Sequence, residues 1–157
     1  VEEPRNNRYA LVVTVGNYSD KSIPELPGTK YDRESATKIA QFMQIPTENI
    51  QYLTDEQATG KNIENSIKGL SKRVGEGDRV FIFYSGHGTR YENPLYGTKY
   101  QEKDAPRCVE ALLPYDGGRG AITNREMAKL LEPITQKTDK LFVFYDACFS
   151  SISGKGK

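Results

Sequence analysis

The chain has 157 residues and an almost balanced charge, with 22 Lys and Arg residues against 21 Asp and Glu residues. This length predicts one domain whose core needs neither disulfides nor metals to hold it together. The even mixture of charges excludes a nucleic-acid-binding arm and a membrane-surface helix, and no apolar stretch reaches the roughly 20 residues that cross a bilayer.

The first half of the chain alternates apolar strands with amphipathic helices. Residues 8–16, RYALVVTVG, form a β-branched run closed by a glycine, which predicts a strand buried on both faces. A second strand is predicted over residues 49–55, NIQYLTD. Apolar residues at helical spacing predict helices over residues 28–43 and 60–78. Their apolar stripes are Ala36, Ile39, Ala40 and Met43 in the first helix and Ile63, Ile67, Leu70 and Val74 in the second.

The second half continues this alternation after one excursion. Residues 79–86, RVFIFYSG, are a third apolar run and predict another buried strand. The polar, Gly-rich and Tyr-rich residues 90–120 predict a hairpin in which residues 108–114, CVEALLP, form one arm. A helix follows over residues 123–134, and residues 140–146, KLFVFYD, predict a fourth buried strand.

Two helices are predicted to begin at capping boxes. In such a box the side chain of a Ser or Thr binds a backbone N–H three residues on, and an acidic side chain there reaches back. The spacing predicts one box at Thr29 and Asp32 and another at Thr123 and Glu126.

The order of elements predicts an α/β fold. Apolar strands that alternate with amphipathic helices indicate a largely parallel sheet, covered on both faces by helices and joined by right-handed crossovers. Such a sheet binds its ligands at the carboxyl ends of the strands. We expect residues 1–150 to form this domain and residues 151–157, the end of the Gly-, Ser- and Lys-rich terminus SSISGKGK, to be a flexible linker.

The cysteines limit both the chemistry and the compartment. Cys108 and Cys148 form no CxxC pair, and with the single histidine, His87, they are too few for a four-ligand structural zinc site. This cysteine usage favours a reducing compartment, so we expect a cytoplasmic protein. We interpret Cys108 as structural.

A thiol and an imidazole follow two strands that we expect to be neighbours. His87 comes just after the third strand, and Cys148 just after the fourth. Neighbouring strands lie about 4.8 Å apart, so both side chains would share the edge where ligands bind. A nearby imidazole converts a thiol into a thiolate nucleophile and can protonate a leaving amine. Because the glycines beside His87 carry no side-chain bulk, the backbone N–H groups of Gly88 and Cys148 can stabilise an oxyanion.

Each of these residues also has a plain structural interpretation. A lone cysteine that closes an apolar strand is most often part of the core, and a lone histidine in a Gly-rich turn usually lies on the surface. Their joint placement after two successive buried strands favours a catalytic pair.

The segments around both residues resemble a known family. YSGHG at residues 84–88 and DACFS at residues 146–150 are similar to the catalytic motifs of caspase-like cysteine peptidases, especially metacaspases and orthocaspases. The resemblance implies a caspase-like α/β/α sandwich and the role of a large catalytic subunit, paired with a small subunit from the same precursor. It also implies a dyad, with His87 as general base and acid, Cys148 as nucleophile and Gly88 as oxyanion donor. No third catalytic residue is evident from the sequence.

The same resemblance implies a specificity for basic residues. The arginine and glutamine that give caspases their preference for aspartate are absent here, since Leu26 and Pro27 precede GTKYD and Asp146 stands in place of the glutamine. Metacaspases line this pocket with two aspartates, at positions that match Asp32 and Asp146. A carboxylate pair suits the side chain of Arg or Lys and rejects an acidic one. The alternative for Asp32 is the capping role, and for Asp146 a strand-end turn.

Self-cleavage and calcium binding are further implications of the resemblance. Lys157, in the predicted linker, is a residue after which such a peptidase could cleave its own precursor. Many metacaspases bind Ca²⁺, but Val109 and Lys155 occupy positions where acidic residues are common, so we expect no required cofactor. The oxygen ligands that a calcium site would draw on are Glu102, Asp104, Glu110 and Asp116.

Two other functions remain open. A catalytically silent caspase-like module with a regulatory or scaffold role would carry the same motifs. A nucleotide-binding α/β domain is disfavoured, because VGNYSD follows the first strand in place of a Gly-rich phosphate-binding motif.

Overall fold

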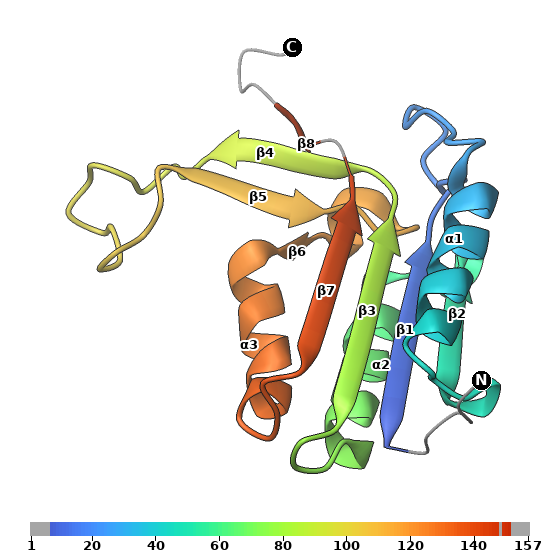
Figure 1. Cartoon of the computed structure of the whole chain (residues 1–157). Helices are drawn as coiled ribbons and strands as arrows, with labels where there is room; N and C mark the ends of the chain where they lie inside the picture. Colours follow the sequence, from blue (N-terminus) through green and yellow to red (C-terminus); the bar gives the residue numbers. More distant parts are fainter. Residues whose placement is uncertain (1–6, 148, 152–157) are drawn as a thin grey trace.

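The main sheet has four parallel strands in the order β2-β1-β3-β7 (Figure 1). The computed structural model describes residues 7–147 and 149–151. The strands are β1 (Arg8–Thr14), β2 (Ile50–Thr54), β3 (Arg79–Ser85) and β7 (Leu141–Asp146). The predicted α/β fold with a largely parallel sheet is confirmed, and so is the predicted pairing of the third and fourth strands.

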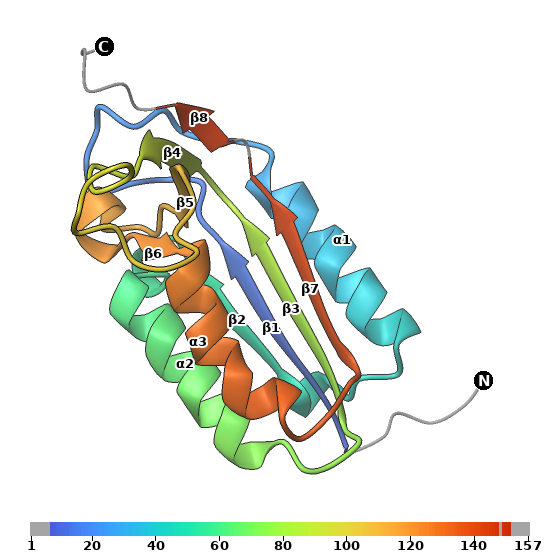
Figure 2. The ribbon, with the colours of Figure 1, turned by 90° about the vertical axis from the view of Figure 1, so that its left-hand side faces the viewer.

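Helices cover the two faces of this sheet unequally. Helix α1 (Thr29–Phe42) lies on one face, and α2 (Gly60–Arg73) and α3 (Asn124–Thr135) lie side by side on the other (Figure 2). Single-turn 3₁₀ helices η1 (Thr47–Asn49), η2 (Asp55–Gln57) and η3 (Gly117–Gly120) lie in the connections. No helix in the described part of the chain is long and apolar enough to cross a membrane.

The apolar periodicities place a hydrophobic core on each face. Ile63, Ile67 and Leu70, the apolar stripe of α2, are buried against one face of β1 and β3. On the other face, Ala36 and Ala40 of α1 are fully buried between this helix and the sheet. These two alanines let α1 approach the sheet closely, which brings the first turn of this helix next to the strand ends.

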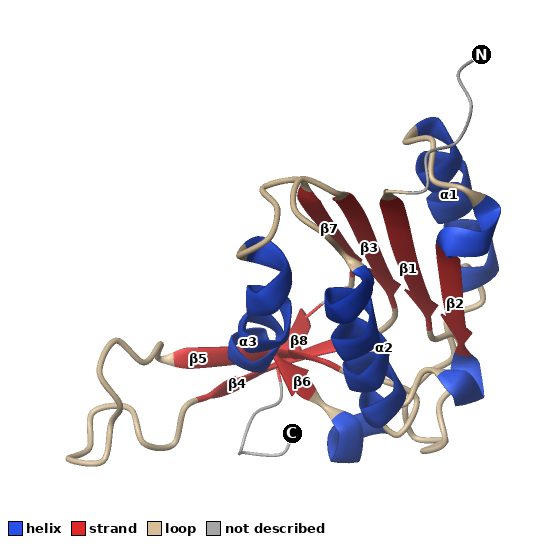
Figure 3. Ribbon diagram, turned by 90° about the horizontal axis from the view of Figure 1, so that it is seen from below, coloured by secondary structure: helices blue, strands red, loops and turns tan. Residues whose placement is uncertain are grey.

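A second, smaller sheet lies across the carboxyl ends of the main strands (Figure 3). Its strands are β4 (Gly88–Glu92), β5 (Cys108–Leu112), β6 (Ile122–Thr123) and β8 (Phe149–Ser151). The predicted hairpin is confirmed, because β4 and β5 pair antiparallel. Strands β6 and β8 were not predicted, since two or three residues carry no readable periodicity.

Strand β7 is less buried than we predicted. Phe142 and Phe144 are 52% and 54% exposed, whereas Leu141 and Val143 pack against the core on the side of α3. Helix α1 packs against β1 and β3, and β7 is the last strand of the main sheet in the described part of the chain. The face of β7 that carries the two phenylalanines is therefore open.

The prediction for the start of α1 was also wrong. Gly28, not Thr29, is the N-cap residue, and no side chain caps the helix. The hydroxyl of Thr29 donates instead to the carbonyl oxygen of Leu26, at 3.2 Å. By contrast, the capping box of Thr123 and Glu126 is confirmed, with its two reciprocal bonds at 3.0 and 2.9 Å.

The first residue of the predicted linker, Ser151, lies in a strand. Ser151 belongs to β8 and pairs with Arg90. Residues 152–157, including the predicted cleavage position Lys157, lie outside the described residues.

The two predicted capping boxes provide a matched test of helix stability. Because Thr123 caps α3 and Thr29 caps nothing, we expect Thr123→Ala to lower the free energy of unfolding by about 1 kcal/mol and Thr29→Ala to lower it by clearly less. Urea denaturation of both variants measures this. Equal losses would contradict the difference between the two helix starts.

Candidate active site

The carboxyl ends of β3 and β7 bring together several of the predicted site residues. Ser85 and Asp146, the last residues of these strands, are direct partners in the parallel ladder. His87 follows Ser85 by two residues, and Gly88 begins β4 beside Phe149 of β8. The predicted nucleophile, Cys148, lies outside the described residues, so its role and its distance from His87 stay predictions.

The imidazole of His87 is oriented by a backbone carbonyl group. Its Nε2 atom lies 2.8 Å from the carbonyl oxygen of Pro24, in the loop between β1 and α1. A carbonyl oxygen can only accept, so Nε2 carries the proton and donates it. In neutral His87 this leaves Nδ1 as the basic nitrogen. With Nε2 bound in this way, Nδ1 is the ring nitrogen that can accept a proton, as the predicted general base requires.

The contact between His87 and the carbonyl oxygen of Pro24 was not predicted from the sequence. A main-chain carbonyl group is present at every residue, so no residue type at position 24 could have signalled this contact. Only the path of the loop over His87 reveals it.

Gly88 is buried and pairs with Leu112 on one side and Phe149 on the other. Its position directly after His87 fits the predicted oxyanion donor, which stays a prediction.

The two predicted pocket aspartates lie together. Asp32 comes from the first turn of α1 and Asp146 from the end of β7, and Ser85 stands between these elements. The buried hydroxyl of Ser85 donates to Oδ2 of Asp32 at 2.7 Å. Asp32 therefore binds the end of β3, and the capping role considered for it is wrong.

The environment at the end of β7 favours the protonated form of Asp146. Partial burial, the negative charge of Asp32 and a hydrogen bond with the Asp32 carboxyl group all raise the pKa of Asp146. Two carboxylates held side by side repel each other unless a proton or a cation lies between them. The pair is therefore suited to bind a positively charged group.

The acidic residues considered for calcium do not form a metal site. Glu102 pairs with Arg125 and Glu110 with Arg90, each at 2.6 Å. Asp116 accepts the backbone N–H of Gly60. Within residues 7–147 and 149–151, no three Asp, Glu, His or Cys side chains gather as ligands. The described residues thus do not fit the calcium site.

Cys108 is not a core residue. It lies in β5 with an exposed side chain and a free thiol. Its predicted structural role finds no support in packing.

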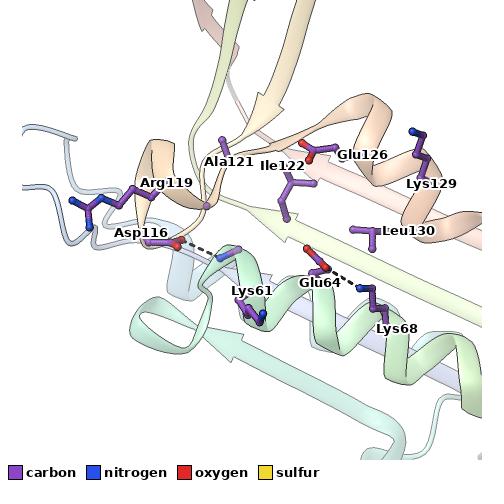
Figure 4. A pocket seen from close by; sticks show the side chains of 12 residues that line it. Lys61, Glu64, Lys68, Asp116, Arg119, Ala121, Ile122, Glu126, Lys129 and Leu130 are labelled. Carbon is purple, nitrogen blue, oxygen red and sulfur yellow. Dashed lines mark hydrogen bonds and ion pairs between the residues drawn. The ribbon is translucent and has the colours of Figure 1, made fainter.

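A separate hollow of about 520 Å³ lies between α2, η3 and α3. Figure 4 shows its charged lining, in which Lys68 pairs with Glu64 and Asp116 binds the first turn of α2. Neither His87 nor the aspartate pair lines this hollow. It is therefore distinct from the candidate active site.

Solved structures include close matches to this fold. A crystal structure of a protein from Geobacter sulfurreducens matches with a TM-score of 0.70, over 90% of this chain and 50% of that one, at 22% identity. At this identity the match shows the fold alone.

Curated relatives with sequence similarity are metacaspases. Metacaspase-6 of Arabidopsis thaliana is 28% identical over 147 residues, which cover 90% of this chain and 37% of the relative. Metacaspase-1A of Aspergillus oryzae is 28% identical over 151 residues, covering 91% of this chain and 34% of the relative. Metacaspase-1 of Plasmodium falciparum is 27% identical over 168 residues, covering 96% and 25%. The chain thus spans about a quarter to two fifths of the length of these relatives.

The sequence profile of the caspase domain matches residues 7–157. This match spans both predicted catalytic motifs and all the strands described above. The chain therefore belongs to the caspase domain family of peptidases, with metacaspases among its relatives.

Proposed function

We propose that this chain is the catalytic part of a cysteine endopeptidase that cleaves after Arg or Lys. The observation that carries the proposal is the bond from Nε2 of His87 to the carbonyl oxygen of Pro24, because it leaves Nδ1 as a base at the carboxyl ends of β3 and β7. Membership of the caspase domain family supports the same activity.

The proposed reaction is an acyl transfer in two steps. His87 takes the proton of Cys148, and the thiolate attacks the carbonyl carbon of the scissile peptide bond. Backbone N–H groups of Gly88 and Cys148 stabilise the oxyanion, and His87 returns the proton to the leaving amine. A water molecule, activated by His87, then hydrolyses the thioester and restores the thiol.

The proposed specificity arises from Asp32 and Asp146. A guanidinium or ammonium group between the two carboxylates would remove the repulsion that raises the pKa of Asp146. Ser85 fixes one oxygen of Asp32 through its hydrogen bond. An acidic side chain in this place would add a third negative charge and be rejected.

We further propose that a small subunit from the same precursor covers the open face of β7. Phe142 and Phe144 expose apolar surface there, and in the described part of the chain β7 is the last strand of the main sheet, with one edge unpaired. The relatives are much longer than this chain, which leaves room for such a segment. Cleavage after Lys157 by the peptidase itself would separate the two subunits.

The first test is peptide hydrolysis by the complete protein. We expect cleavage of fluorogenic peptides that end in Arg or Lys but not in Asp, and complete loss of cleavage in Cys148→Ala and His87→Ala.

The specificity pocket is tested with the same peptides. Asp146→Asn should lower kcat/KM for Arg peptides by about 10- to 100-fold, which corresponds to the loss of one hydrogen bond to a charged group. Asp139→Asn, at an exposed residue just before β7 and at the opposite end of that strand from Asp146, serves as the control and should leave kcat/KM unchanged. Cleavage after Asp would refute the pocket, and no cleavage by folded protein would favour a scaffold role.

The pH dependence of stability gives a second test of the aspartate pair. Because the pKa of Asp146 is raised by folding, the folded chain binds this proton more tightly than the unfolded chain does. The free energy of unfolding therefore falls as the pH rises from the ordinary pKa of aspartate through the raised pKa of Asp146. It stays lower at neutral pH. We expect Asp146→Asn to be more stable than the wild type at neutral pH, by less than about 1 kcal/mol, with the difference vanishing in acid.

The matched control for this test is Asp20, an aspartate whose pKa is shifted in the opposite direction. Hydrogen bonds from Ser22 lower the pKa of Asp20, so its ionised form favours the folded state at neutral pH. Asp20→Asn should therefore not stabilise the protein at neutral pH. Urea denaturation at neutral and at mildly acidic pH measures both variants, and equal behaviour of the two would contradict the coupling between Asp32 and Asp146.

The small subunit can be tested through Phe142. In the isolated 157-residue chain, Phe142→Ser should change the free energy of unfolding by less than about 1 kcal/mol, since half of this side chain is exposed. In the complete protein the same substitution should cost about 2 to 4 kcal/mol, as for a buried Phe. Tyr100→Ser, at an exposed residue of the β4–β5 hairpin, should behave alike in both proteins. Equal costs for Phe142→Ser in the two proteins would refute the cover.

A further inference from the structure

Two buried tyrosine hydroxyl groups meet behind His87. Tyr18 lies in the loop after β1 and Tyr84 is the last but one residue of β3, and their exposed fractions are 1% and 2%. The Oη atom of Tyr18 accepts the backbone N–H of His87 at 2.7 Å and donates to the carbonyl oxygen of Leu113 at 2.9 Å. The Oη atom of Tyr84 lies 2.6 Å from the carbonyl oxygen of Leu113 and 2.9 Å from that of His87, and its single proton is shared between these two acceptors. Phenol groups thus bind both backbone polar groups of His87.

The tyrosine rings also restrict the imidazole and its neighbours. The ring centroids of Tyr18 and His87 are 5.3 Å apart, in tilted contact. A Cβ atom at Gly86 would lie 2.7 Å from Oη of Tyr84 and 3.1 Å from Oη of Tyr18. Position 86 therefore has to be glycine for the two hydroxyl groups to remain where they are.

Both hydroxyl groups stay protonated at neutral pH. Burial raises the pKa of Tyr18, and burial together with the neighbouring Tyr18 raises the pKa of Tyr84 well above its usual range. The two groups therefore act as fixed hydrogen-bonding partners and do not exchange protons with the base.

The loop that carries Tyr18 is itself held at several points. The carboxylate of Asp55 accepts the backbone N–H groups of Gly16 and Asn17, at 2.8 and 3.1 Å. Beyond Tyr18, the backbone N–H of Ser19 donates to the carbonyl oxygen of Tyr115 at 3.1 Å. Because Pro24 belongs to the same loop, one segment holds both the backbone and the ring of His87.

We propose that Tyr18 and Tyr84 are positioning residues for His87, which place its Nδ1 atom for proton transfer with Cys148. The proposal rests on the proposed peptidase function, since it assigns a role in placing the base. Displacement of a catalytic group by about 1 Å can lower a rate by about 100-fold. Loss of the Tyr18 hydroxyl group would remove the acceptor that binds the backbone N–H of His87. Loss of the Tyr84 hydroxyl group would remove one of two donors to the carbonyl oxygen of His87, the other being the backbone N–H of Leu113 at 2.9 Å. Either loss would weaken the hold on the His87 backbone and allow such a displacement.

The test uses Tyr18→Phe and Tyr84→Phe in the complete protein with Cys108→Ser. Two quantities are measured: kcat and KM on an Arg peptide, and the rate at which iodoacetamide alkylates Cys148 as a function of pH, quantified by mass spectrometry at that residue. We expect each variant to lower kcat on the order of 10- to 100-fold, with KM within about twofold. The alkylation profile should move to higher pH, because a displaced imidazole supports the thiolate less well.

Tyr52→Phe is the matched control. It removes a tyrosine hydroxyl group that bonds to Thr37 at 2.7 Å, on β2 and away from His87. This variant should keep both the wild-type kcat and the wild-type alkylation profile. It reports the effect of removing a tyrosine hydroxyl group at a place that does not contact His87.

The outcomes separate this proposal from the proposed function. If His87→Ala abolishes the alkylation of Cys148 at low pH while both Phe variants keep the wild-type profile and kcat, the tyrosines are only structural and the positioning role is refuted. If His87→Ala leaves the profile unchanged, the dyad itself is refuted. Should one Phe variant fail to fold, the other decides the question by the same readouts.

Discussion

The pairing of β3 with β7 is the constraint on which the candidate active site depends. Its parallel register sets Ser85 beside Asp146, so the segments that leave these two strands start from the same level of the sheet. A shift by one residue would turn every side chain of β7 to the opposite face. Phe142 and Phe144 would then face α3, and Asp146 would turn away from Asp32.

Helix α1 contributes to the site because small residues form the face with which it packs on the sheet. Its contact face is made by Ala36 and Ala40, which add little bulk between helix and strands. The first turn therefore reaches the end of β3, where Asp32 accepts the hydroxyl group of Ser85. The fold tolerates an unfavourable pair of carboxyl groups at this place, which is typical of sites where stability is given up for function.

Local patterns in the sequence predicted most of the fold. The strands of the main sheet and the three helices have clear periodicities, and the box at Thr123 and Glu126 was readable from its spacing. The start of α1 was misjudged because a sequence cannot show that Asp32 has a better partner than its own helix, the distant Ser85. The exposure of β7 was missed because an apolar strand looks the same whether or not something covers it.

The sequence predicted the residues of the candidate site whose side chains have a recognisable chemistry, but it did not predict the contacts that hold them. His87 and the two aspartates stand out by residue type and by their places after strands or at a helix start. The contacts of His87 with Pro24 and Tyr18 join residues more than 60 positions apart in the chain. No spacing rule reaches that far, so these contacts required the folded chain.

The role of Pro24 has a consequence for how this loop can vary. The group that orients the imidazole is a main-chain oxygen, so many residue types at position 24 would supply the same acceptor. What must not change is the path of the chain between Tyr18 and that oxygen, since both ends contact His87. The number of residues between positions 18 and 24 therefore constrains the site more than the residue type at position 24 does. A deletion in this loop should be more harmful than a substitution of Pro24.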